Sequence, residues 1–111
     1  MTVYQELDHA LERLEATLKA ADLWSASRPP ASAFDSQQPF CLDTMELPQW
    51  LRYVFIARLS AVVEAEGSLP PNCEVAPAAE VYLKQSGVRA SNLLLVVKAI
   101  EEVDRVINEA D

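Results

Sequence analysis

The sequence predicts an all-α protein, a compact four-helix bundle with a long ordered loop between its first and second helices. Two long segments repeat apolar residues at spacings of three and four, which is the period of an amphipathic helix. The chain has only two glycines, Gly67 and Gly87, whereas a β protein needs many for its tight turns. With 111 residues, half of them apolar, the chain has the size of one domain, residues 1–111.

The first predicted helix covers residues 2–24. Its apolar side chains recur at intervals of three and four: Tyr4, Leu7, Leu11, Leu14, Leu18 and Ala21. Its other face is charged, and Glu15 precedes Lys19 by one helical turn, an arrangement that stabilises a helix slightly. Because the seam lasts only about three heptads, we expect one helix of a bundle rather than a coiled coil.

Residues 25–43 show no period and are rich in proline and serine, which predicts a loop. Loops near this length in compact domains are generally either functional or disordered. Burying Phe34, Phe40 and Leu42 would contribute roughly 2 kcal/mol for each side chain. We therefore predict a segment that its own apolar side chains hold in place.

The second predicted helix covers residues 45–65, with Asp43 as N-cap and Glu46 as its capping-box partner. Pro48 conflicts with this start, so either the first turn is irregular or the regular helix begins near Pro48. Beyond it, apolar residues cover most of the circumference: Trp50, Leu51, Val54, Phe55, Ile56, Leu59, Val62 and Val63. Such a helix is central, or it presents a binding face.

Two further helices are predicted over residues 77–86 and 88–110. Pro77 suits a first helical position, and Gly87 suits a helix end. The inner face of the last helix is apolar: Leu93, Val96, Val97, Ile100, Val103 and Ile107. On its outer face, Glu101 and Arg105 have the spacing of a favourable ion pair.

The charge and hydropathy of the chain disfavour several classes of function. A formal charge of −8 without a basic run disfavours direct binding to nucleic acid or to anionic lipid. No apolar run approaches the ~18 residues of a membrane span, and the first residues lack signal-peptide features. We therefore expect a cytoplasmic protein whose Cys41 and Cys73 are free thiols.

No catalytic constellation is visible. The carboxylates of Asp43, Glu46 and Glu64 are explained by helix capping and solvation, because no spacing pairs them across a cleft. His9 is the only histidine, and neither cysteine lies in a recognisable nucleophile motif. We expect no enzyme activity, no metal and no cofactor.

Arg58 is the most unusual residue of the second helix. At 100° per residue it projects among Leu47, Leu51 and Val54. A guanidinium on an apolar face pairs internally, extends its stem to solvent, or anchors a carboxylate of a partner. Aromatic residues concentrate between residues 24 and 55 and form either core or a groove. The predicted interaction groove consists of Phe34, Phe40, Trp50, Tyr53 and Arg58.

These motifs carry a family resemblance. The segments 34–40, 43–46 and 75–77, together with single residues between and after them, resemble the YqcC-like family of small bacterial proteins; the single residues are Trp50, Leu51, Ile56, Arg58 and Glu80. The resemblance implies a compact bundle of four helices without an established activity. It also implies a gene that commonly lies beside that of tRNA pseudouridine synthase C.

Three classes of function remain open at this point, of which a small enzyme is disfavoured because no catalytic set is visible. The first is a non-enzymatic adaptor that binds another protein, with tRNA pseudouridine synthase C as the implied partner. An acidic exterior would complement a basic RNA-modifying enzyme. The alternative is a helical module that binds a small ligand or an anion through Arg58 and the aromatic cluster.

Overall fold

The computed structural model describes residues 2–110 and contains helices and no strand within that range. The elements in chain order are α1 (Val3–Ala20), η1 (Ala31–Asp35), η2 (Pro39–Cys41), α2 (Leu47–Trp50), η3 (Leu51–Ile56), α3 (Ala57–Ala65), α4 (Ala76–Gln85) and α5 (Ala90–Asn108). Because α2, η3 and α3 follow one another without a break, the described residues form four helices. The predicted all-α, four-helix fold is confirmed.

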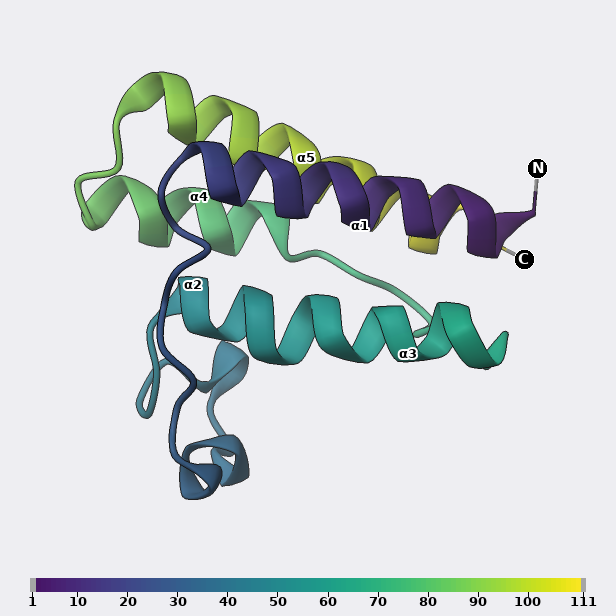
Figure 1. Ribbon diagram of the computed structural model, residues 1–111, viewed down its shortest axis with the longest axis horizontal. Coiled ribbons are helices and arrows are strands. Elements are labelled where there is room, and N and C mark those ends of the chain that lie inside the picture. The colour runs from purple at the N-terminus through teal and green to yellow at the C-terminus, as the bar shows by residue number, and fades with distance from the viewer. Residues whose placement is uncertain (1, 111) are drawn as a thin grey trace.

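The arrangement of the helices is simple. Helices α1 and α5 lie side by side, α4 packs beside α5, and the α2–η3–α3 helix runs along the other side of the bundle (Figure 1). The core is formed by the apolar seams of these helices, which include Leu7, Leu14, Leu51, Leu83 and Ile100, each without exposed surface. The long loop projects from the end of the bundle where α2 begins (Figure 1).

Helix α1 is shorter than predicted, and its ends explain why. Thr2 and Gln5 form a reciprocal capping box at the start. At the other end the Leu23 N–H donates to the Leu18 carbonyl, and Asp22 adopts a left-handed conformation with φ 61°. This is the Schellman motif that ends many helices. The helix therefore stops at Ala20, although the apolar seam continues beyond it.

The second helix begins later than the predicted Asp43 cap, so the cap prediction was wrong, and the alternative of a start near Pro48 is confirmed. Glu46 is the N-cap, and it exchanges capping-box hydrogen bonds with Gln49. Pro48 then occupies the first turn, where the missing N–H of proline costs no helical hydrogen bond. The Asp43 carboxylate instead accepts a hydrogen bond from the Ser36 hydroxyl within the loop.

The middle of this helix is wound as a π-helix from Leu51 to Ile56. A π turn adds about one residue relative to an α turn, so the residues after it are rotated by roughly 100°. Leu51, Val54, Phe55 and Ile56 are all buried in this wider turn. The π segment thus increases the number of side chains that the helix buries, and it changes which residues of α3 face outward.

Hydrogen bonds from the second helix order the loop between residues 21 and 46. The Tyr53 hydroxyl donates to the Ala26 carbonyl at 2.9 Å, and Gln49 Nε2 donates to the Ser27 carbonyl at 2.9 Å. Thr44 Oγ1 closes the far side of the loop by donating to the Ala33 carbonyl at 2.7 Å. The loop is ordered as predicted, but polar side chains contribute to its anchoring as well as Phe34 and Phe40.

The connector between α3 and α4 is held by two polar residues of α5 that sequence reasoning missed. Asp104 is buried, with 7% of its surface exposed, and accepts hydrogen bonds from the Val75 and Ala76 N–H groups at 3.2 and 2.9 Å. The Cys73 thiol donates to the same carboxylate at 3.0 Å. Asn108 donates to the Cys73 carbonyl and accepts from its N–H, both at 2.8 Å.

Asp104 therefore caps helix α4 from a neighbouring helix. The carboxylate satisfies N–H groups that have no partner inside α4, and its charge is favourable at a helix N-terminus. Burial, followed by the hydrogen bond to Asp104, raises the pKa of the Cys73 thiol from its ordinary 9.0 to about 12. This thiol stays protonated at neutral pH and is a structural donor rather than a nucleophile.

No helix within residues 2–110 is both long enough and apolar enough to cross a membrane.

Candidate functional site

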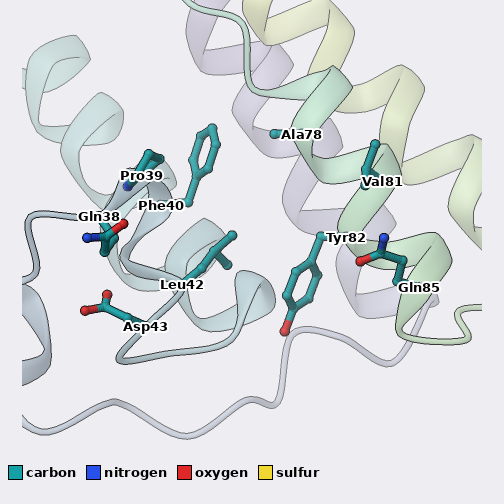
Figure 2. Close-up of a pocket in the computed structure, with 9 residues that line it drawn as sticks. All are labelled: Gln38, Pro39, Phe40, Leu42, Asp43, Ala78, Val81, Tyr82 and Gln85. Atoms are coloured by element: carbon teal, nitrogen blue, oxygen red, sulfur yellow. The ribbon is translucent and has the colours of Figure 1, made fainter.

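An open apolar groove lies between the η2 turn and helix α4 (Figure 2). Its volume is about 750 Å³. One wall comes from the loop and the other from α4; the lining residues are Gln38, Pro39, Phe40, Leu42, Asp43, Ala78, Val81, Tyr82 and Gln85. The floor is apolar, and the amides and the carboxylate stand at the rim, as Figure 2 shows.

The α4 wall follows from helical spacing. Ala78, Val81, Tyr82 and Gln85 stand at positions i, i+3, i+4 and i+7, so they share one face of the helix. Ala79 and Leu83 face the core and are fully buried. Helix α4 therefore has two apolar faces, one turned to the core and one turned to the groove.

The loop wall is built on an unusual backbone. Phe40 and Cys41 both have positive φ values, 58° and 52°, which non-glycine residues rarely adopt. This turn places the Phe40 ring edge-on against Trp50 at 5.0 Å between centroids, and Trp50 stacks on Phe55 at 5.3 Å. Backbone strain of this kind is commonly found at functional sites, where the surrounding packing maintains it.

Two groove residues are much more exposed than apolar side chains usually are. Leu42 has 42% of its surface exposed, and Val81 has 57%. With Phe40 and Tyr82 half-buried beside them, they form a contiguous apolar surface that a partner could cover. The arrangement offers contact area and shape rather than reactive groups.

The structure separates the residues of the predicted interaction groove into three locations. Phe40 lines the groove, and Trp50 lies behind it. Phe34 and Tyr53 lie outside the groove lining, and both rings are close to the Arg28 guanidinium, although Phe34 also packs against the same small core cluster as Trp50. Arg58 is exposed and lies apart from both groups, outside the lining of the groove.

The projection of Arg58 onto the apolar face was wrong, for an identifiable reason. It assumed 100° per residue throughout, whereas η3 adds about one residue to the turn before Arg58. The guanidinium is therefore rotated to the exterior. The Arg58 guanidinium takes part in none of the ion pairs or side-chain hydrogen bonds within residues 2–110. This excludes an internal ion pair between Arg58 and any described residue.

Sequence reasoning missed Leu42, Val81 and Tyr82 as groove residues. A signal was present, because the face of α4 that carries Ala78, Val81 and Tyr82 is apolar in addition to the face that packs in the core. The position of the η2 turn opposite this face was not visible, because it depends on two positive φ values at non-glycine residues.

The acidic residues considered for catalysis have structural or solvent-exposed positions. Glu46 caps α2, Asp43 accepts from Ser36, and Glu64 is exposed on α3. Within the described range, no three His, Cys, Asp or Glu side chains form a cluster that could hold a metal ion.

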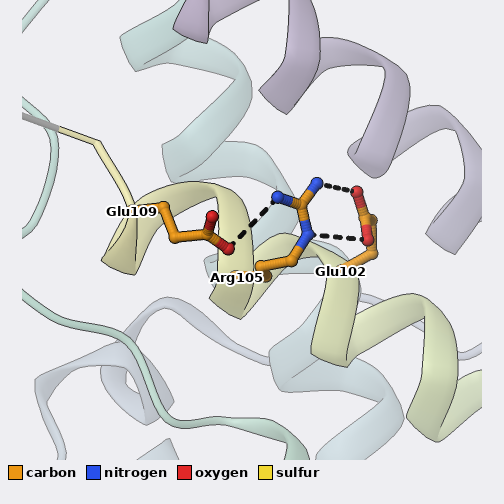
Figure 3. A network of polar contacts seen from close by, with 3 residues as sticks. All are labelled: Glu102, Arg105 and Glu109. Carbon is orange, nitrogen blue, oxygen red and sulfur yellow. Dashed lines mark hydrogen bonds and ion pairs between the residues drawn. The ribbon is translucent and has the colours of Figure 1, made fainter.

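One predicted ion pair forms and another is replaced. Lys19 Nζ lies 2.8 Å from Glu15 Oε2, as predicted. Arg105 pairs with Glu102 and, at 3.2 Å, with Glu109, instead of the predicted Glu101 (Figure 3). The hydrogen bonds from Arg105 lower the pKa of Glu102. The network is exposed, and Figure 3 shows it on one helix, so it does not connect elements of the fold.

Comparison with known proteins places this chain in a family. Residues 6–103 match the model of the DUF446 family, which carries the description tRNA pseudouridine synthase C. The chain belongs to this family. Its sequence is 37% identical over 93 residues to an uncharacterised protein of Haemophilus influenzae, covering 84% of this chain and 87% of that protein.

The YqcC protein of Escherichia coli, also uncharacterised, is 32% identical over 104 residues, covering 94% of this chain and 93% of YqcC. The solution NMR structure of YqcC matches this structure with a TM-score of 0.84 at 30% identity, over 100% of this chain and 92% of the other. The predicted resemblance to YqcC-like proteins is confirmed.

A third relative differs in size. A protein of Pectobacterium carotovorum named tRNA pseudouridine synthase C is 34% identical over 70 residues, which are 63% of this chain but only 19% of that protein. Most of that protein therefore lies outside the matched segment.

Proposed function

We propose that this chain is a non-enzymatic protein-interaction module, and that a tRNA pseudouridine synthase docks in the groove between η2 and α4. The proposal rests on the exposed apolar surface of Leu42 and Val81. This surface lines the same groove as Phe40, which belongs to the strained turn at Phe40 and Cys41. Apolar surface of this kind, bordered by polar groups, is typical of protein contact sites.

The identity of the partner rests on the relatives. The family carries the name of the synthase, and one protein with that name contains a segment similar to this chain. A segment that is covalently joined to an enzyme in one bacterium can act on it as a separate chain in another. Joining them raises the effective concentration of one for the other without any new contact.

The groove also indicates what kind of segment would bind. Full burial of side chains such as leucine or valine contributes about 1.5–3 kcal/mol each, so Leu42 and Val81 can anchor an apolar segment. Asp43 stands at the rim, and the whole chain has a formal charge of −8. The complementary surface is an apolar segment flanked by basic residues, as an RNA-modifying enzyme would supply.

Isothermal titration calorimetry with the purified tRNA pseudouridine synthase C of the same organism tests the proposal. We expect Leu42→Asp and Val81→Asp each to weaken binding by about tenfold or more. Leu94→Asp is the matched control, because Leu94 is an α5 residue with 56% exposure that lies outside the groove lining. No binding by the unmodified chain, or equal losses in all three variants, would contradict the proposal.

A small-ligand-binding module is the second candidate, because the groove volume of about 750 Å³ is within the range of ligand pockets. Such a ligand would contact Phe40 and Tyr82 rather than Arg58. In a thermal-shift screen, a metabolite that stabilises the unmodified chain but not Val81→Asp would favour this function over the first.

A further inference from the structure

Three cations and three aromatic rings alternate along the face where the loop covers the second helix. We call this set the cation–π ladder; in order it consists of Lys19, Trp24, Arg52, Tyr53, Arg28 and Phe34. The five steps between a cation and the next ring centroid are 5.5, 4.5, 5.0, 5.7 and 5.5 Å. All lie within the distance at which a cation is attracted to a ring face.

The ladder is built on ordered backbone. Arg52 donates from Nη1 to the Trp24 carbonyl, and the Tyr53 hydroxyl donates to the Ala26 carbonyl. Gln49 fixes the next residue by donating to the Ser27 carbonyl. Arg28 therefore follows directly on an anchored stretch of loop and is placed between two rings, and its side chain takes part in none of the hydrogen bonds found in the described part of the chain.

The two arginines have hydrogen-bonding capacity to spare. A guanidinium carries five N–H donors. Among residues 2–110, Arg28 and Arg52 belong to none of the ion pairs, and the one side-chain hydrogen bond from them is that of Arg52 to Trp24. Stacking against a ring occupies the face of a guanidinium and leaves its N–H edge available for a planar, two-pronged acceptor.

The ladder also differs in charge from the rest of the chain, because its three charged residues are all bases. The chain has nine lysines and arginines against seventeen acids, and three of the nine bases stand in this one row. Because Lys19 is already paired with Glu15, the positive charge available in this row within residues 2–110 is that of Arg28 and Arg52, which are held on pre-organised side chains. Pre-organisation favours binding, because little side-chain entropy is lost on contact.

We propose that Arg28 and Arg52 form a docking surface for an acidic segment of a protein partner, whose Asp or Glu carboxylates accept the guanidinium N–H edges. A protein segment fits better than RNA because the ladder rings already carry cations close to their centres, so they offer little free surface for stacking bases.

This surface does not depend on the groove. The groove lining contains no ladder residue, and the two sites would bind opposite charges. A failure of the synthase to bind the groove leaves the ladder proposal unaffected, and the reverse also holds.

The test uses the full chain labelled with ¹⁵N and follows the arginine Nε–Hε signals by NMR at low ionic strength. The probe is a capped hexaglutamate peptide, with capped hexaglutamine as the uncharged control. We expect the Arg28 and Arg52 signals to move and to saturate, while the Arg58 signal stays in place. Arg58 is a matched control, since it is exposed on the same continuous helix as Arg52 but outside the ladder.

Substitutions sharpen the result. Arg28→Gln should weaken peptide binding by about fivefold or more, and Arg58→Gln should leave it unchanged. Arg28→Lys should restore only part of the loss, because lysine retains the charge without the planar fork. Arg28 takes part in none of the side-chain hydrogen bonds found within residues 2–110, so its variants should keep the amide spectrum of the folded chain.

Three outcomes would overturn the proposal. One is that all arginine signals move equally, which would indicate non-specific attraction. Another is that none moves at millimolar peptide. The third is that an oligouridine RNA moves the Arg28 and Arg52 signals at lower concentration than the peptide does, which would assign the surface to nucleic acid.

Discussion

The two long irregular segments of this protein are held in place by opposite chemistry. The connector of residues 66–75 has its backbone N–H groups bound by acceptors on α5, chiefly the buried Asp104 carboxylate. The loop of residues 21–46 has its carbonyls bound by donors on the second helix, including Arg52 and Tyr53. The first contact is buried and involves a full negative charge, whereas the second is partly open to solvent.

This difference predicts unequal contributions to stability. A buried carboxylate that accepts three hydrogen bonds leaves several unsatisfied donors when it is altered, and buried unsatisfied groups are costly. Donors at a partly exposed loop can be replaced by water at small cost. The connector should therefore be essential to the fold, whereas the loop should tolerate change and is better suited to binding.

The largest expected effect is that of Asp104→Asn. The amide removes the charge and replaces one of the two acceptor oxygens by an NH2 group, which leaves either the Ala76 N–H or the Val75 N–H and the Cys73 thiol facing a donor, so we expect the free energy of unfolding to fall by about 3 kcal/mol. Urea denaturation followed by circular dichroism measures it. Asp8→Asn, on the exposed face of α1, is the control and should change little. Equal stability of the two variants would show that Asp104 does not anchor the connector.

The next effect depends on pH. The pKa of the Cys73 thiol is raised to about 12 in the folded chain from its ordinary value of 9.0, which applies to the unfolded chain. Below that lower value, the Cys73 thiol is protonated in both the folded and the unfolded state. Above it the unfolded state loses the proton first, so the stability that this thiol contributes is lost as the pH rises toward 12.

Between pH 9 and 11, the unmodified chain should therefore lose stability more steeply than Cys73→Ala, by up to about 1.4 kcal/mol per pH unit. Comparing the two chains cancels the titration of lysines and tyrosines. Parallel stability curves over this range would mean that the thiol titrates normally in the folded protein.

A smaller effect is expected in the loop. Tyr53→Phe removes the hydrogen bond to the Ala26 carbonyl but retains the ring, so stability should fall by about 1 kcal/mol. Tyr82→Phe is the matched control, because the Tyr82 hydroxyl makes none of the hydrogen bonds found within residues 2–110. If Tyr53→Phe proved as damaging as Asp104→Asn, the contrast between the two segments would fail.

The smallest effect should follow Arg105→Gln. This residue pairs with Glu102 and Glu109 on the exposed face of α5 (Figure 3), and exposed ion pairs within one helix contribute little. We expect no measurable change in the midpoint of thermal unfolding. A clear decrease would indicate that the network supports packing in a way that its exposed position does not suggest.

Much of the fold was predictable because its signals are local. The apolar seams of α1 and α5 repeat over several turns, and periodicity of that kind survives in any tertiary context. Pro48 marked the true start of the second helix, since proline favours the first turn. The contacts of Asp104 with the Val75 and Ala76 N–H groups were not predictable. The position of Asp104 in the apolar stripe between Ile100 and Ile107 was nevertheless a signal that a buried polar contact exists.

The candidate sites were less predictable because they depend on backbone geometry and on contacts far apart in sequence. The η3 turn moved Arg58 to the exterior, and no residue pattern indicated that turn. The groove requires the positive φ values of Phe40 and Cys41 opposite α4. The cation–π ladder joins Lys19 to Phe34 only through Arg52 and Tyr53 of another helix.

The sequence by itself determined that this protein is helical, acidic and apolar along its helix seams, because composition and period are properties of the chain alone. Only the tertiary structure decided which apolar face stays open and which arginines gather on one surface. Those outcomes depend on the winding of one helix and on hydrogen bonds between residues more than twenty positions apart. Such contacts arise when the chain is packed, so no local pattern records them.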